Sequence, residues 1–262
     1  MKLYKSNIIV ENSVLEDIIT KLDNYSNTCF IHLGISQPPS FYNIFTYNDI
    51  DFRKLKHKFT NILLYIDYNN KGEYIIKCIK KIKKECKKYN ISLGTNDNKK
   101  IVGFIFSKNE ISKYDQLITS INAILIDDKK YRYEYLYDSI CKYLDNEFIN
   151  KDICGFSNDK CIAKKDLNKT MGCCYNFKNK RLGMLGPYKP DLCEYMHNKK
   201  CSADCISCKL YTCDYLRKRG IKYTTNSILM IKCFFNPIQK LVVTTSFFKT
   251  KQNILSKLIL FG

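Results

Sequence analysis

The chain has 262 residues, of which 45% are hydrophobic, and its formal net charge is +19. This length is enough for one large domain or two modest ones with a buried core, so a disulfide scaffold is not needed for stability. Charged side chains interrupt residues 1–20 and no apolar run approaches the length of a membrane span, which argues against a secretory leader and a membrane partner. We therefore expect a cytoplasmic protein whose cysteines stay reduced.

The positive charge has two interpretations. It fits a polyanionic partner such as nucleic acid, or it reflects composition, because Lys, Asn, Ile and Tyr are the residues that an A/T-rich coding sequence favours. Only five of the 44 basic residues are Arg, the side chain on which specific phosphate and base contacts depend. Three of the five, Arg181, Arg217 and Arg219, lie in or beside a cysteine-rich stretch, which favours the nucleic-acid interpretation slightly.

Residues 1–148 are expected to form an α/β domain. Helices are predicted at residues 12–24, 72–89 and 133–144, and strands at residues 29–33, 61–67, 90–94, 101–106 and 123–127. Strands that alternate with helices favour a mainly parallel sheet with right-handed crossovers. The predicted fold class is therefore α/β, a mainly parallel sheet with helices, joined to a small irregular cysteine-rich metal-binding domain and a helical C-terminal segment.

In open sheets of this kind, ligands bind beyond the carboxyl ends of the strands. Two predicted strands end in acidic residues, at Asp67 and at the pair Asp127-Asp128, whose carboxylates could hold a metal ion or a hydroxyl group. The alternative is that each Asp caps the following helix or begins a turn. Isolated glycines such as Gly34 and Gly103 form no phosphate loop, so the sequence disfavours a dinucleotide or P-loop site.

Residues 149–220 are expected to form a cysteine-rich metal-binding domain. Nine of the 14 cysteines of the chain lie in this stretch: Cys154, Cys161, Cys173, Cys174, Cys193, Cys201, Cys205, Cys208 and Cys213. In a reducing compartment such a density indicates metal ligands or redox chemistry, because free thiolates oxidise and cross-link. The weak apolar periodicity here is typical of loops that are held by ligands rather than by a core.

The spacing of these cysteines gives two candidate ligand sets. The set with the shortest mutual spacings, and our best single site, is Cys201, Cys205, Cys208 and Cys213. A second set is Cys154, Cys161, Cys173 and Cys174, with Cys193 and His197 as further candidates for either set. Sulfur ligands suit both zinc and iron–sulfur clusters, so the expected cofactor is either of these.

The other cysteines have a simpler interpretation. Five of them lie in apolar runs or on apolar helix faces and are interpreted as small buried hydrophobic residues: Cys29, Cys78, Cys86, Cys141 and Cys233. The same interpretation is the alternative to metal binding for members of the cysteine-rich stretch. No internal repeat stands out along the chain.

Two family resemblances rest on the cysteine spacing. Cys201-x3-Cys205-x2-Cys208 has the ligand spacing of radical SAM enzymes, but only 54 residues follow Cys208, and Ser207 stands where that family usually has an aromatic residue. A divergent or rearranged relative is therefore the form that this resemblance allows. The adjacent pair Cys173-Cys174 within a wider set resembles the bacterial cysteine-cluster proteins that chelate zinc or iron. That resemblance covers residues 154–213 and implies metal chelation.

Residues 221–262 are expected to form a helical C-terminal segment that packs back on the body of the protein. Asn236 followed by Pro237 predicts a helix start. An amphipathic final helix is predicted from four apolar residues at helical spacing: Ile254, Leu255, Leu258 and Ile259.

These patterns support three hypotheses about function. The first is a cytosolic metal-binding protein that carries zinc or an iron–sulfur cluster on its cysteine-rich domain. The second is a zinc-supported nucleic-acid-binding protein that presents Arg181, Arg217 and Arg219. The third is an iron–sulfur enzyme, related to radical SAM enzymes, that binds its substrate near Asp67 and Asp127. The sequence assigns no catalytic residue.

Overall fold

The structure, a computed structural model, describes part of the chain. The described residues are 8–9, 28–33, 44–46, 51–53, 61–66, 72–89, 101–106, 111–150, 156–157, 160–161, 196–197, 200–201, 204–247 and 249–262. The predicted helix at 12–24 and the predicted strand at 90–94 lie outside these residues. The chain divides into two compact units, Met1–Asp127 and Asp128–Gly262. This division assigns the helix that follows Asp128 to the second unit, whereas the sequence analysis included it in the first domain.

The described residues of the first unit include five short parallel strands. They are β1 (Ile8–Ile9), β2 (Thr28–Leu33), β3 (Ile44–Thr46), β4 (Asn61–Ile66) and β5 (Ile101–Phe106). Their order across the sheet is β1-β5-β4-β2-β3. Thr28 of β2 pairs with Asn61 of β4, and the register between β4 and β5 shifts between Ile62 and Leu63.

Two long helices, α3 (Gly72–Lys88) and α4 (Ile111–Leu125), pack against each other in this unit. Five residues that the sequence predicted on one apolar face of α3 are all buried: Ile75, Ile76, Ile79, Ile82 and Cys86. Lys83 of α3 donates a hydrogen bond to the carbonyl oxygen of Ile124 at 2.6 Å and so ties the two helices together.

The predicted strand at 123–127 is wrong, because residues 111–125 form a helix. Leu117, Ile121 and Ile124 recur at helical spacing and are buried. A four-residue apolar run cannot by itself distinguish a buried strand from the end of a buried helix, and the helical spacing upstream decides between them.

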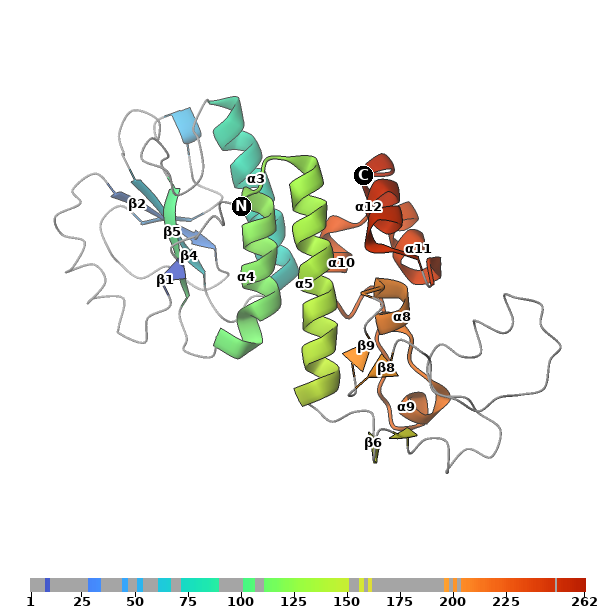
Figure 1. Ribbon diagram of the computed structural model, residues 1–262. Coiled ribbons are helices and arrows are strands. Elements are labelled where there is room, and N and C mark those ends of the chain that lie inside the picture. Colours follow the sequence, from blue (N-terminus) through green and yellow to red (C-terminus); the bar gives the residue numbers. More distant parts are fainter. Residues whose placement is uncertain are drawn as a thin grey trace. The chain divides into compact units, whose positions relative to one another are not determined.

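The described residues of the second unit form helices and two very short antiparallel strand pairs. The helices are α5 (Lys129–Asn150), α8 (Ile206–Leu210), α9 (Asp214–Lys218), α10 (Leu229–Phe234), α11 (Pro237–Thr245) and α12 (Lys251–Leu260). The strands are β6 (Phe156–Ser157), β7 (Lys160–Cys161), β8 (Met196–His197) and β9 (Lys200–Cys201). Helix α5 is the longest helix of this unit, and α8, α10, α12 and β9 pack against it (Figure 1).

Helix α11 begins where the sequence indicates. The Asn236 side chain accepts a hydrogen bond from the Gln239 backbone N–H, and the Gln239 side chain accepts one from the Asn236 backbone N–H, while Pro237 occupies the first turn. This reciprocal capping satisfies two backbone donors that would otherwise lack partners. Ile254 and Leu258 of α12 are fully buried, and α12 contacts both α5 and α11.

The predicted α/β fold class is wrong for the chain. Among the residues whose side chains the structure places, 73% are helical and 2% lie in strands. The parallel strands are short and confined to the first unit, whereas the described core of the second unit is formed by helices. The physical reason is that helical apolar periodicity continues through residues 111–150 and returns after residue 228, so helices bury most of the apolar surface that the structure describes.

Candidate metal centre

The structure places some of the nine predicted metal ligands. Cys205, Cys208 and Cys213 are buried, with 0%, 6% and 7% of their surfaces exposed. Cys161 and Cys201 are placed by backbone alone, as the last residues of β7 and β9. Four predicted ligands lie outside the described residues: Cys154, Cys173, Cys174 and Cys193.

Cys205 and Cys208 form a close thiol pair at the start of α8. Cys205 is the N-cap residue of this helix, and Cys208 follows within its first turn. A hydrogen bond between the two side chains raises the pKa of Cys205, and burial raises it further. The Sγ of Cys205 also donates a hydrogen bond to the carbonyl oxygen of Ser246 at 3.2 Å. The structure therefore brings together the two cysteines with the shortest spacing in the best predicted site.

Helix α8 is fixed to α11 on one side of the thiol pair. Ser207 directly precedes Cys208 in the chain. Its hydroxyl donates a hydrogen bond to the carbonyl oxygen of Val243 at 2.7 Å. Ser207 is 1% exposed, and Val243 is fully buried. A buried hydroxyl that is paired in this way holds the backbone between Cys205 and Cys208 in one position.

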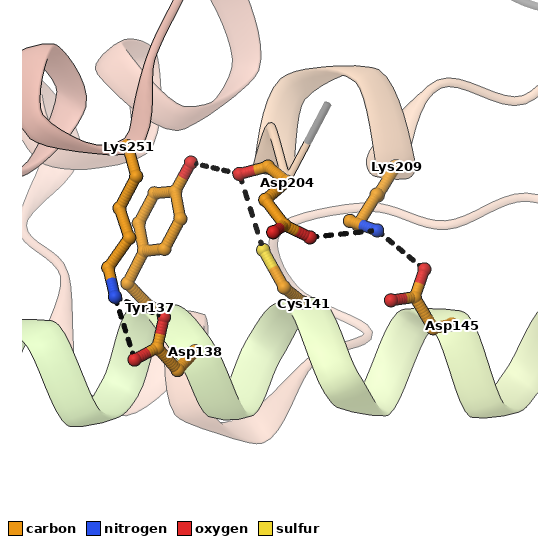
Figure 2. Close-up of polar contacts among 7 residues, drawn as sticks. All are labelled: Tyr137, Asp138, Cys141, Asp145, Asp204, Lys209 and Lys251. Atoms are coloured by element: carbon orange, nitrogen blue, oxygen red, sulfur yellow. Dashed lines mark hydrogen bonds and ion pairs between the residues drawn. The ribbon is translucent and has the colours of Figure 1, made fainter. Parts of the chain in front are cut away.

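Helix α5 holds the same turn from another side, through contacts that we call the α5 clamp (Figure 2). The carbonyl oxygen of Asp204 accepts a hydrogen bond from the hydroxyl of Tyr137 at 2.6 Å and a weaker one from the thiol of Cys141 at 3.8 Å. After the thiol pair, Lys209 Nζ lies 2.5 Å from Asp145 Oδ1. The clamp thus joins α5 to the residue before Cys205 and to the residue after Cys208.

The geometry of the clamp is costly to form. Asp204 has φ of +42°, a left-handed conformation that residues other than Gly adopt rarely. The side chain of Lys209 is 1% exposed and that of Asp145 is 13% exposed, so both charges have left bulk water. Such features persist only where the surrounding contacts fix them. In this protein the contacts of the α5 clamp fix the backbone around the thiol pair.

The thiol pair fits part of a soft-metal site. Two adjacent, buried cysteines supply two of the four sulfur ligands that a tetrahedral zinc or an iron–sulfur cluster requires. Within the part of the chain that the structure describes, no group of three or more His, Cys, Asp or Glu side chains could hold a metal ion. Further ligands would therefore have to come from the cysteines whose side chains are not described. Among these, Cys201 lies four residues before Cys205.

Cys213 occupies different surroundings. It caps α9 and packs with Tyr215 and Leu216 in a separate apolar cluster, against which Phe148 and Tyr223 also lie. The described residues thus bring Cys205 and Cys208 together but do not bring Cys213 into one group with them.

Cysteines outside the cysteine-rich stretch have the surroundings that the sequence predicted. Cys78, Cys86 and Cys141 are buried and free of disulfides, and Cys233 is partly buried. Burial raises the pKa of the Cys86 thiol to about 12 and raises that of Cys141 as well. The side chain of Cys29, in β2, is not among those described.

Cys86 is expected to resist alkylation in the native protein. A thiol with a pKa of about 12 has roughly three orders of magnitude less thiolate at pH 8 than an unperturbed cysteine, and this one is also fully buried. Iodoacetamide labelling followed by peptide mass spectrometry should find Cys86 unmodified before unfolding and modified in urea. Cys233, which is partly exposed, serves as the internal control and should react first. Equal labelling rates for the two thiols in the native protein would contradict this assignment.

The acidic ligand site predicted at the sheet edge has no support among the described residues. Asp127 follows helix α4 rather than a strand, and its carboxylate is 77% exposed and lies 2.7 Å from Lys83 Nζ. Asp128 accepts a hydrogen bond from the backbone N–H of Tyr131 near the start of α5, which is the capping role considered as the alternative. Asp67 lies outside the described residues.

Sequence reasoning did not find the α5 clamp. Cys141 was predicted to lie on an apolar helix face, but only as a small buried hydrophobic residue. The signal that could have found the clamp is Asp145, which lies four residues after Cys141 and therefore places a carboxylate on that same face. A charged residue on a buried helix face indicates a buried partner.

Comparisons with known proteins give no relative for this chain: no protein family, no curated protein and no solved structure matches it. Among the described residues, no helix is both long and apolar enough to cross a membrane. The assignment of function therefore depends on the site itself.

Proposed function

We propose that the chain is a metal-binding protein whose cysteine-rich stretch, residues 154–213, holds zinc or an iron–sulfur cluster. The observation that carries the proposal is the buried contact between Cys205 and Cys208, held in place by α5 and α11. Six further cysteines of the stretch, whose side chains the structure does not describe, are available for the remaining ligand positions.

The α5 clamp supports a role beyond packing for the thiol pair. Two thiols used only as small hydrophobic residues would not need a left-handed Asp204 before them and a buried charge, Lys209, after them. A ligand pair does need a fixed backbone, because metal affinity depends on holding its donors at bonding distance. The clamp is consistent with that requirement.

In this proposal some residues bind the metal and others position the ligands. Cys205 and Cys208 would supply two thiolates, while Tyr137, Asp145 and Ser207 hold the turn that presents them. Bound zinc would stabilise the loops of the stretch, and a bound iron–sulfur cluster would also accept and release electrons.

Metal analysis after anaerobic purification tests this proposal. The purified chain is expected to contain bound zinc or iron in stoichiometric amounts, and an iron–sulfur cluster would give visible charge-transfer absorption that zinc does not. A chain that keeps its helical circular dichroism, titrates all 14 thiols as reduced and contains neither metal would overturn the proposal.

A second candidate function is nucleic-acid binding. An exposed basic segment that follows Cys213 favours it. Arg217, Lys218 and Arg219 are all exposed. The guanidinium of Arg219 lies 3.8 Å from the centre of the Tyr215 ring. That of Arg217 lies over Tyr211 and donates to the carbonyl oxygen of Thr212 at 2.9 Å. Arginines ordered in this way lose less entropy when they contact phosphates.

A salt titration tests this second candidate. Binding to duplex DNA should weaken by about 0.9 log units per phosphate contact for each tenfold increase in salt. Replacing both Arg217 and Arg219 with Ala should lower that slope by about two contacts, whereas replacing Lys77 and Lys81, on the exposed face of α3, should leave it unchanged. An identical slope for the arginine and lysine variants would count against the segment as an interface.

A further inference from the structure

Two short hairpins in the cysteine-rich stretch have the same backbone design. In the first, Phe156 pairs with Cys161, and in the second, Met196 pairs with Cys201. Each hairpin has two strands of two residues joined by a two-residue turn, and in each the second strand ends on a cysteine. The two cysteines therefore occupy the same register position in two equivalent hairpins.

The sequences around the hairpins match without a gap at an offset of 40 residues. Of the 21 positions from 158 to 178, eight are identical to the residue 40 positions later. The identical pairs are Asn158/Asn198, Lys160/Lys200, Cys161/Cys201, Ala163/Ala203, Lys169/Lys209, Cys173/Cys213, Tyr175/Tyr215 and Lys178/Lys218. Upstream, Cys154 and Cys193 precede their hairpins at an offset of 39. The expectation that the chain has no internal repeat is therefore wrong for this stretch, because the eight matching residues are scattered among differing ones.

The repeat sorts the nine cysteines into two groups. Three cysteines of each copy have a counterpart in the other copy, and the rest belong to one copy alone: Cys174 to the first, and Cys205 and Cys208 to the second. The first copy thus has four thiols and the second has five. Because a tetrahedral site or a cubane cluster takes four sulfur ligands, each copy has enough for a site of its own.

From the shared register and the shared spacing we infer that residues 154–178 and 193–218 are two copies of one metal-binding unit, each of which holds its own zinc ion or iron–sulfur cluster. This inference rests on the proposed function. The second copy contains the buried thiol pair Cys205–Cys208, for which the first copy has Lys165 and Asn168 instead. The two sites therefore differ in their ligands and are separable by substitution.

Metal counting on matched variants of the full chain tests the inference. One variant carries Cys154→Ser with Cys161→Ser, and the other carries the equivalent pair, Cys193→Ser with Cys201→Ser. Each is expected to retain half of the metal bound by the unsubstituted chain, measured as metal per chain after anaerobic purification. The variant that combines all four substitutions is expected to bind none. Cys78→Ala in α3 is the control that should retain all of the metal, and circular dichroism monitors the helical content of every variant.

The outcomes separate this inference from the proposed function. An unsubstituted chain without metal would overturn both. A chain that binds one zinc ion or one cluster would support the proposed function and overturn the inference, as would loss of all metal in either pair variant while helical content is retained. If a pair variant loses its helical content, reconstitution of the purified unsubstituted chain with measured metal additions decides the matter, because two sites saturate at twice the metal of one.

Discussion

Replacing both Cys205 and Cys208 with Ser is expected to lower the bound metal per chain and to destabilise the second unit. Serine offers a hard, protonated hydroxyl in place of a soft thiolate, and zinc and iron clusters hold it poorly. At a structural site the free energy of metal binding is also free energy of folding, about 10–16 kcal/mol for zinc in small peptides. Metal analysis and urea unfolding followed by circular dichroism measure the two effects.

Substitutions in α3 provide the matched control for this experiment. Cys78→Ala combined with Cys86→Ala also removes two buried thiols, but from a helix of the first unit whose cysteines have only packing roles. This variant should lose stability through packing and keep all of its metal. Equal metal content in the Ser variant, the Ala variant and the unsubstituted chain would show that the thiol pair is not a ligand pair.

Replacing Asp145 with Ala is expected to destabilise the second unit by about 3 kcal/mol. The substitution leaves the ammonium of Lys209, which is 1% exposed, with the more distant and largely exposed carboxylate of Asp204 at 3.8 Å. A buried charge that loses its close partner keeps its desolvation cost without the compensating attraction. Urea unfolding measures the change, and the metal content should also fall because the clamp positions Cys208.

Asp138→Ala is the control for Asp145→Ala. It breaks an ion pair of the same helix, two turns before Asp145. Its partner Lys251 lies 2.6 Å from Asp138, but the two side chains are 32% and 58% exposed. An exposed pair of this kind contributes at most about 1 kcal/mol. Similar destabilisation by the two substitutions would mean that the Asp145–Lys209 pair has no special role in holding the turn.

Helices with one apolar face could be predicted from the sequence. Ile75, Ile79 and Cys86 in α3, and Leu136 and Ile140 in α5, lie where their spacing placed them, because a 3.6-residue period fixes the buried face of a helix. The start of α11 at Asn236-Pro237 was predictable for a similar reason, since capping depends on neighbouring residues alone.

Features that depend on distant contacts could not be predicted. The Tyr137–Asp204 hydrogen bond joins residues 67 positions apart, and the Lys209–Asp145 pair joins residues 64 apart. No local pattern specifies such a pairing. The run at 123–127 was assigned to the wrong element because its four apolar residues fit either a strand or a helix. The helical spacing of the buried residues Leu117, Ile121 and Ile124 decides between the two.

For the predicted metal ligands, too, the contacts set by short spacing could be predicted and those set by distant residues could not. The two-residue spacing of Cys205 and Cys208 predicted that their side chains would meet, because one turn at a helix start brings them together. Cys213 was assigned to the same site on spacing alone, yet its cap position and its packing on Tyr215 depend on α9 and on Phe148.

X-ray absorption at the metal edge of the purified chain tests the central claim most directly. The account predicts a first shell of about four sulfur atoms at about 2.3 Å from the metal, because only cysteines are numerous enough in residues 154–213 to supply such a shell. A first shell of oxygen and nitrogen at about 2.0–2.2 Å, or a chain that binds no metal, would contradict it.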